Sequence, residues 1–293
     1  MDRKRFLLSL AALPLASKAM QLNELKTITD HFKLSERMPV LFLGHGSPMN
    51  AISENEFVAA FRKLGHELPK PQAILCVSAH WETRGTQVTA MAMPRTIHDF
   101  GGFPPELFAV QYPAPGSPEL AVETQKLITS TTVELDQQWG LDHGAWSVVK
   151  HLYPSADVPI IQMSLDKDMS PAQHYALAKE LGALRNKGVL IVGSGNLVHN
   201  LRLVTWDRIN EHYGLDWALE AREIMNRAIL SGDHQALMNY SKLGSAVQLA
   251  IPTPEHFLPL LYTLALQQPG EQASLFNDKP IGGAATMTSV RIG

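Results

Sequence analysis

The chain has 293 residues, of which 45% are hydrophobic, and this is enough apolar material for the core of one large domain. Its net charge of -3 shows no basic excess, which argues against a nucleic-acid-binding protein. Cys76 is the only cysteine, so the chain has neither an intrachain disulfide nor a thiolate metal site. Because Cys76 lies in an apolar run, we expect a buried, unreactive thiol.

The N-terminal residues 1–19 have the layout of an export signal. The basic segment RKR (residues 3–5) precedes an apolar stretch over residues 6–16, and the small-x-small sequence SKA follows at residues 17–19. The apolar stretch is too short to span a membrane, and RKRFL is similar to a twin-arginine motif with lysine replacing one arginine. We therefore expect a periplasmic protein with no membrane segment in its mature form. A cytoplasmic protein that retains an N-terminal amphipathic helix is the alternative.

After a polar connector at residues 20–37, strand-like apolar runs alternate with helical stretches. The strands are predicted at residues 40–43, 73–79, 87–91, near 133, 158–165 and 189–192, and the helices at residues 54–64, 118–128, 145–152, 171–187 and 217–230. This alternation predicts an α/β fold, a single domain with a mainly parallel central sheet flanked by helices. Residues 94–118 are rich in proline and glycine and are expected to form a long functional loop.

Three of the predicted strands lead into a histidine. His45 follows the first strand in LFLGHGSPMN, His80 follows the second in SAHW, and His199 follows a later one in GSGNLVHN. The carboxyl ends of parallel strands line one crevice, so these histidines are expected to meet although they lie far apart in sequence. Because imidazole is the commonest metal-ligand side chain, the pattern predicts a metal site at the carboxyl ends of the strands. Each residue could instead be a hydrogen-bonded turn histidine, and Trp81 beside His80 is either a wall of the site or a core residue.

A fourth histidine, His256, precedes the apolar run of residues 257–266. Thr253 as N-cap and Pro254 as first helical residue predict that a helix begins here, with His256 in its first turn. The positive end of the helix dipole favours a neutral imidazole, which is the form that binds metal. A surface histidine at a helix start is the alternative.

Two further histidines stand next to an acidic residue. His143 follows Asp142, and His98 precedes Asp99. Each histidine could act as an acid, a base or a hydrogen-bond donor to substrate, or it could be a structural loop residue. Residues adjacent in sequence need not face one another, so neither pair is predicted to be a dyad.

Six motifs, taken together, carry a family resemblance. They are, in chain order, GHGSPMN, SAHW, TIHDFGGFP, DHGAW, GSGNLVHN and TPEHFLPLLY. In these motifs residues 38–293 closely resemble the 4,5-DOPA extradiol dioxygenases, which are class III ring-cleaving dioxygenases akin to the beta subunit of protocatechuate 4,5-dioxygenase. The resemblance implies that residues 38–293 form the catalytic domain.

The resemblance also implies roles for the histidines. The residues that match the family's metal site are His45, His80, His199 and His256. His143 matches a further active-site histidine, and the counterpart of His199 in related enzymes transfers protons, so His143 and His199 are the catalytic candidates and His199 is either ligand or acid–base. His98 is the candidate for substrate binding.

The implied reaction is 4,5-extradiol cleavage of a catechol such as L-DOPA by O2, which gives a muconic semialdehyde. Protocatechuate enzymes complete their iron site with a glutamate, whereas His256 takes that place here, with Glu255 beside it. An all-histidine site suits Fe(II) or Zn(II), so we expect one ion of either metal per chain. The alternatives are a zinc-dependent hydrolase and a non-catalytic binding module similar to the Memo proteins.

Overall fold

The computed structural model describes residue 32 and residues 34–293. The predicted export signal at residues 1–19 and most of the connector lie outside these residues. Within the described part of the chain, no helix has the length and apolar content needed to cross a membrane.

The centre of the molecule is an eight-stranded sheet with the order β4-β3-β5-β2-β6-β1-β10-β7. The strands are β1 (Val40–Gly44), β2 (Ala73–Thr83), β3 (Thr86–Thr89), β4 (Val133–Asp136), β5 (Ile160–Asp166), β6 (Val189–Gly195), β7 (Ala273–Phe276) and β10 (Ser289–Ile292). The four central strands β5, β2, β6 and β1 run parallel, whereas β3 pairs antiparallel with β5, and β10 with both β1 and β7. The predicted mainly parallel α/β fold is confirmed. A separate two-stranded ribbon joins β8 (Pro280–Ile281) and β9 (Ala285–Thr286).

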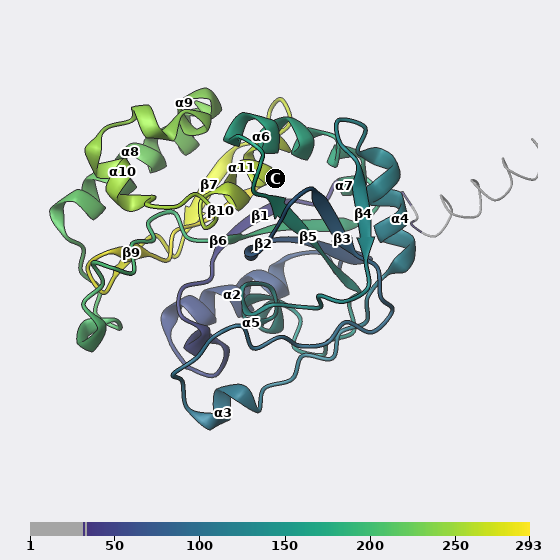
Figure 1. Ribbon diagram of the computed structural model, residues 1–293, viewed down its shortest axis with the longest axis horizontal. Helices are drawn as coiled ribbons and strands as arrows, with labels where there is room; N and C mark the ends of the chain where they lie inside the picture. The colour runs from purple at the N-terminus through teal and green to yellow at the C-terminus, as the bar shows by residue number, and fades with distance from the viewer. Residues whose placement is uncertain (1–31, 33) are drawn as a thin grey trace, which may run out of the picture.

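Helices lie on both faces of the sheet (Figure 1). The α-helices of the described residues are α2 (Glu56–Glu67), α3 (Pro105–Phe108), α4 (Pro118–Leu127), α5 (His143–Leu152), α6 (Pro171–Lys179), α7 (Gly182–Arg185), α8 (Asp216–Ser231), α9 (His234–Met238), α10 (Ser245–Ala250) and α11 (Leu258–Ala265). Helices α2 and α5 lie on one face, and α4, α6 and α11 on the other. Along β1, Leu41 packs in the core on the side of α2 and α5, and Phe42 packs in the core on the side of α4, α6 and α11, because successive side chains of a strand point to opposite faces. Both faces are buried, which explains why the central strands are apolar without interruption.

Strand β2 is longer than predicted. It continues to Thr83, so His80 and Trp81 lie within the strand, beyond a register irregularity that begins at Val77. Cys76 is buried in this strand, and its burial raises the pKa of the thiol, as expected for an unreactive cysteine. Trp81 is buried and stacks on Trp139, so it is a core residue and not a wall of the site.

The predicted helix start near Pro254 is wrong. Helix α11 begins only at Leu258, and His256 belongs to the turn that precedes it. The Thr253 hydroxyl donates to the Glu255 carboxylate, and no helix-capping bond from this side chain is formed. The backbone N–H of Asn196 donates to the carbonyl of His256 at 3.0 Å, so the turn is attached to the end of β6. Similarly, the predicted helix over residues 171–187 is divided into α6 and α7.

Candidate functional site

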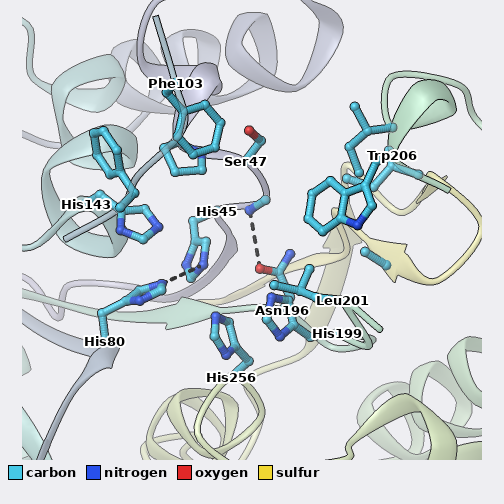
Figure 2. Close-up of a pocket in the computed structure, with 16 residues that line it drawn as sticks. His45, Ser47, His80, Phe103, His143, Asn196, His199, Leu201, Trp206 and His256 are labelled. Atoms are coloured by element: carbon cyan, nitrogen blue, oxygen red, sulfur yellow. Dashed lines mark hydrogen bonds between the residues drawn. The ribbon is translucent and has the colours of Figure 1, made fainter. Parts of the chain in front are cut away.

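Five histidines that are distant in sequence line one pocket of about 240 Å³ (Figure 2). His45 follows β1, His80 lies in β2, His143 is the first residue of α5, His199 follows β6, and His256 lies in the turn before α11. The predicted convergence of the strand-end histidines is confirmed. The pocket lies at the carboxyl ends of β1 and β6, where parallel α/β sheets commonly bind ligands.

Glycines allow the backbones that carry these histidines to approach one another. Gly46 has a φ of +63°, so the chain turns sharply immediately after His45. A Cβ atom on Gly195 would lie 2.1 Å from the carbonyl oxygen of His256, which shows how closely β6 passes the turn before α11. Residues with side chains would push these two segments, and the histidines with them, apart.

Three of the imidazoles form a compact cluster. One ring nitrogen from each of His45, His80 and His256 lies within 4.8 Å of the others. The Nε2 atoms of His45 and His80 are only 3.2 Å apart (Figure 2). This arrangement points several nitrogen atoms at one position.

Hydrogen bonds fix which nitrogen of His45 is free. Its Nδ1 lies 3.0 Å from the hydroxyl of Ser194, and that hydroxyl donates its own proton to the carbonyl of Gly144. The Ser194 oxygen must therefore accept the Nδ1 proton of His45, which leaves the Nε2 lone pair free for a ligand.

The other two histidines of the cluster are held in the same way. The Nδ1 atom of His256 lies 3.0 Å from Glu255 Oε1, and the Nδ1 atom of His80 lies 3.4 Å from Asp99 Oδ2. A carboxylate or other acceptor on one imidazole nitrogen orients the ring and makes the opposite nitrogen a better metal ligand. In all three rings the nitrogen without such an acceptor is Nε2.

Burial keeps these rings neutral. It lowers the pKa of His45 and His256 well below the usual value, and it lowers the pKa of His80 to about 3. The neighbouring histidines act in the same direction, because they would repel any additional positive charge. Neutral imidazoles at pH 7 offer lone pairs and therefore suit a metal ion.

The donor set fits a first-row divalent metal. Three neutral imidazoles with converging Nε2 atoms can bind Zn(II) or Fe(II) and leave further positions open for small ligands. The Nδ1 proton of His45 is assigned to Ser194, so its Nε2 lone pair faces the Nε2 atom of His80 at 3.2 Å, where one cation could bind both nitrogens. The residues present thus fit a metal.

His143 is paired with an acid that is remote in sequence. Asp99 accepts the backbone N–H of His143 through Oδ1 at 2.8 Å and faces its Nδ1 through Oδ2 at 2.9 Å. Asp142, which precedes His143, instead caps the N-terminus of α5. Asp99 lies in the long loop of residues 94–118, and no spacing in the sequence indicated this pair. Asp99, which follows His98 in the sequence, therefore forms hydrogen bonds with His143.

His199 lies beside the cluster. Its ring stacks on that of His256 with 3.5 Å between centroids and 15° between planes. One of its ring nitrogens lies within 4.8 Å of ligand atoms of Glu255 and His256, but His199 is not part of the compact cluster that contains His45 and His80. Burial lowers the pKa of His199 to about 4, so this ring is also neutral at pH 7.

His98 does not line the pocket. Its Nε2 lies 2.9 Å from the carbonyl of Val110, and its ring packs against Phe108 and Trp146. This geometry gives His98 a structural role in the long loop, and the structure does not place it where a substrate in this pocket could reach it.

The remainder of the pocket is largely apolar, which the sequence patterns did not indicate. The large apolar side chains that line it are Phe100, Phe103, Leu201, Trp206, Ile209 and Ile281. They come from the loop of residues 94–118, the connection between β6 and α8, and the β8–β9 ribbon. The pocket thus combines a polar histidine side with an apolar side, as small-molecule sites commonly do.

Comparisons with known proteins point to one family. Residues 38–269 match the family model described as the catalytic LigB subunit of aromatic ring-opening dioxygenase. The chain is 45% identical over 270 residues to an Escherichia coli K12 protein named 4,5-DOPA dioxygenase extradiol, covering 91% of this chain and 98% of that protein. It is 35% identical over 258 residues to a Beta vulgaris protein with the same name, covering 85% of this chain and 94% of that protein.

A solved structure is also similar. An uncharacterized protein from Escherichia coli K12 superimposes with a TM-score of 0.76 at 42% sequence identity, over 88% of this chain and 100% of that protein. The names of the relatives support a dioxygenase rather than the hydrolase or the binding module considered above. The chain therefore belongs to the aromatic ring-opening dioxygenase family of the catalytic LigB subunit, and it is an oxidoreductase, an extradiol ring-cleaving dioxygenase.

Proposed function

We propose that the protein is a metal-dependent dioxygenase that cleaves a catechol ring beside its two hydroxyl groups with O2 and releases a muconic semialdehyde. The observation that carries this proposal is the convergence of His45, His80 and His256, each with Nδ1 near an acceptor and Nε2 free. L-DOPA is the first candidate substrate, because relatives that are 45% and 35% identical are named for it.

In this proposal His45, His80 and His256 hold one metal ion per chain. A bound metal supplies a Lewis-acid centre for the catechol oxygens and a path for electrons between the ring and O2. Fe(II) is the proposed metal, and Zn(II) is the alternative that the all-histidine donor set also accommodates.

His143 and His199 are proposed to move protons. Asp99 holds the Nδ1 proton of His143, which leaves Nε2 to accept a proton from a catechol hydroxyl and to return one to the product. His199 is buried and neutral beside the cluster, so its ring is a second proton acceptor on the other side of the pocket. This assigns His199 to acid–base chemistry rather than to the metal.

The test is metal reconstitution. The protein is stripped of metal, loaded anaerobically with Fe(II) or Zn(II), and mixed with L-DOPA and simple catechols while O2 uptake and visible absorbance are followed. Oxygen consumption and a yellow ring-opened product with the iron form alone would support the proposal. An iron form that binds one metal per chain yet consumes no O2 with any catechol would refute it.

Export to the periplasm is proposed from residues 1–19 alone. Cell fractionation of the full chain and of a variant with Arg3 and Arg5 changed to lysine tests it. Periplasmic activity that depends on the two arginines supports export, and purely cytoplasmic activity of the full chain refutes it.

A further inference from the structure

Two serines occupy paired positions on neighbouring strands beside the histidine cluster. Ser78 of β2 and Ser194 of β6 are register partners, and both are fully buried. A buried hydroxyl is unfavourable unless it is hydrogen-bonded, so the partners of these two groups show what the groups hold in place. Each serine contacts one histidine of the cluster and one residue that flanks His143 in the sequence.

Ser194 joins His45 to the first turn of α5. Its oxygen lies 3.0 Å from Nδ1 of His45, and its proton is donated to the carbonyl of Gly144, the residue that follows His143. Because the proton of the hydroxyl is committed to Gly144, its oxygen can only accept the bond from His45. The hydroxyl therefore fixes the tautomer of His45 and, at the same time, attaches this ring to the turn that carries His143.

Ser78 makes the equivalent connection for His80. Its hydroxyl donates to Oδ1 of Asp142 at 2.7 Å, and Asp142 precedes His143 and caps α5. The Ser78 oxygen also accepts the backbone N–H of His80 at 3.2 Å. Ser78 thus connects the backbone of His80 to the same turn of α5 from its other side.

The first turn of α5 packs against β2 without spare room. A Cβ atom on Gly144 would lie 2.5 Å from Oγ of Ser78 and 2.8 Å from Cδ2 of His80. The rings of His80 and His143 lie on the same side of the pocket (Figure 2), with 3.9 Å between their centroids. Groups packed this closely move together, so a shift of the turn would displace His80 and His143 at once.

From these contacts we propose that Ser78 and Ser194 form a positioning pair, which sets the metal-binding histidines His45 and His80 against the proton-transferring His143. The inference rests on the proposed function, because the roles of the three histidines come from there. The serines contact neither metal nor substrate and act through the histidines and the start of α5. Ser194 sets the tautomer of a ligand, whereas Ser78 sets backbone and helix-cap positions, so the loss of Ser194 weakens metal binding more.

The first measurement needs neither substrate nor a variant of either serine. Long-range proton–nitrogen NMR spectra of the metal-free full chain with isotope-labelled histidine distinguish a ring protonated at Nδ1 from one protonated at Nε2. The signals of His45 are assigned by their absence in His45→Ala. We expect the Nδ1-protonated form in the unmodified protein and a mixture of both forms in Ser194→Ala. A His45 ring protonated at Nε2 in the unmodified protein would overturn the inference.

The second measurement is the affinity of the metal-free protein for Zn(II), by competition with a chromophoric chelator. Ser194→Ala is expected to raise the dissociation constant about 10- to 100-fold, as the loss of a group that orients a metal ligand commonly does. Ser78→Ala is expected to raise it no more than about tenfold, the effect of one ordinary hydrogen bond.

Ser164→Ala is the matched control for both variants. Ser164 is a fully buried serine of the parallel strand β5, and its hydroxyl bonds to Thr83 and to the backbone of Gln87 instead of to a histidine. This variant should bind Zn(II) as the unmodified protein does. Thermal unfolding followed by circular dichroism compares the stability of the three variants.

Failure of the inference and failure of the proposed function are distinguishable. Unchanged Zn(II) affinity in Ser194→Ala, or equal losses in Ser194→Ala and Ser164→Ala, would overturn the positioning role whether or not the protein cleaves catechols. If the tautomer and affinity results are as expected but the iron form opens no catechol, the catechol activity is refuted and the positioning of the metal-binding histidines stands.

Discussion

The two sides of the pocket are built differently. On the histidine side, His45 and His80 lie on or directly after central strands and are held through Nδ1 by Ser194 and Asp99. On the apolar side, Trp206 and its neighbours lie on a long connection, and Trp206 is largely exposed. The candidate metal-binding groups are thus fixed by the sheet, whereas the apolar groups stand on segments that can vary without disturbing the histidine cluster.

The largest effect is expected on the histidine side. His45→Ala should reduce the bound metal from about one ion per chain to nearly none and abolish turnover, because one of three converging nitrogens is lost. Metal content by elemental analysis and O2 uptake check this. His66→Ala is the control, since His66 is an exposed histidine of α2. Stoichiometric metal in His45→Ala would remove His45 from the ligand set.

His143→Ala should separate proton transfer from metal binding. We expect the metal to stay bound while kcat falls roughly 10²- to 10⁴-fold, the range typical of a lost general acid or base. Single-turnover kinetics of the iron-loaded variant measure the rate of the step that depends on this proton transfer. Kinetics equal to those of the unmodified protein would exclude His143 from the mechanism.

Asp99→Asn tests whether a carboxylate orients the histidine side. An asparagine can accept only one of the two His143 protons with its oxygen, so we expect turnover to fall about 10- to 100-fold with the fold intact. The measurement is kcat together with circular dichroism. Asp168→Asn, at an exposed position, is the control. Turnover within twofold of the original would mean that Asp99 does not position His143.

The smallest effect is expected on the exposed part of the apolar side. Leu201→Ser should change the free energy of unfolding by no more than about 0.5 kcal/mol, as exposed substitutions usually do. Ile281→Ala, at a buried position of the same side, should destabilise the protein by about 2 kcal/mol or more. Urea unfolding midpoints measure both. Equal losses would show that the apolar side is a structural part of the core and not a variable surface.

The strands and three of the pocket histidines, His45, His80 and His199, were predictable because apolar runs that end in small residues and a histidine are typical of buried strands and their loops. The motifs of the family resemblance, and not this pattern, added His143 and His256 to the site. The pairing of Asp99 with His143 was not predictable, since a loop of residues 94–118 can take many paths and only the folded chain selects one. The helix start at Pro254 was predicted wrongly because a tertiary bond, from Asn196 to the carbonyl of His256, holds that segment as a turn. Local capping signals carry no information about such a contact.

Strand β1 has no neighbour from nearby sequence. Val40 pairs with Ile191 of β6 on one side and with Ile292 of β10 on the other. Closing such long loops is entropically unfavourable and is compensated only when most of the sheet has assembled, so contacts of this kind form late in folding. We therefore expect His45 to reach its place last among the pocket residues, and metal uptake to mark a completed fold rather than to nucleate one.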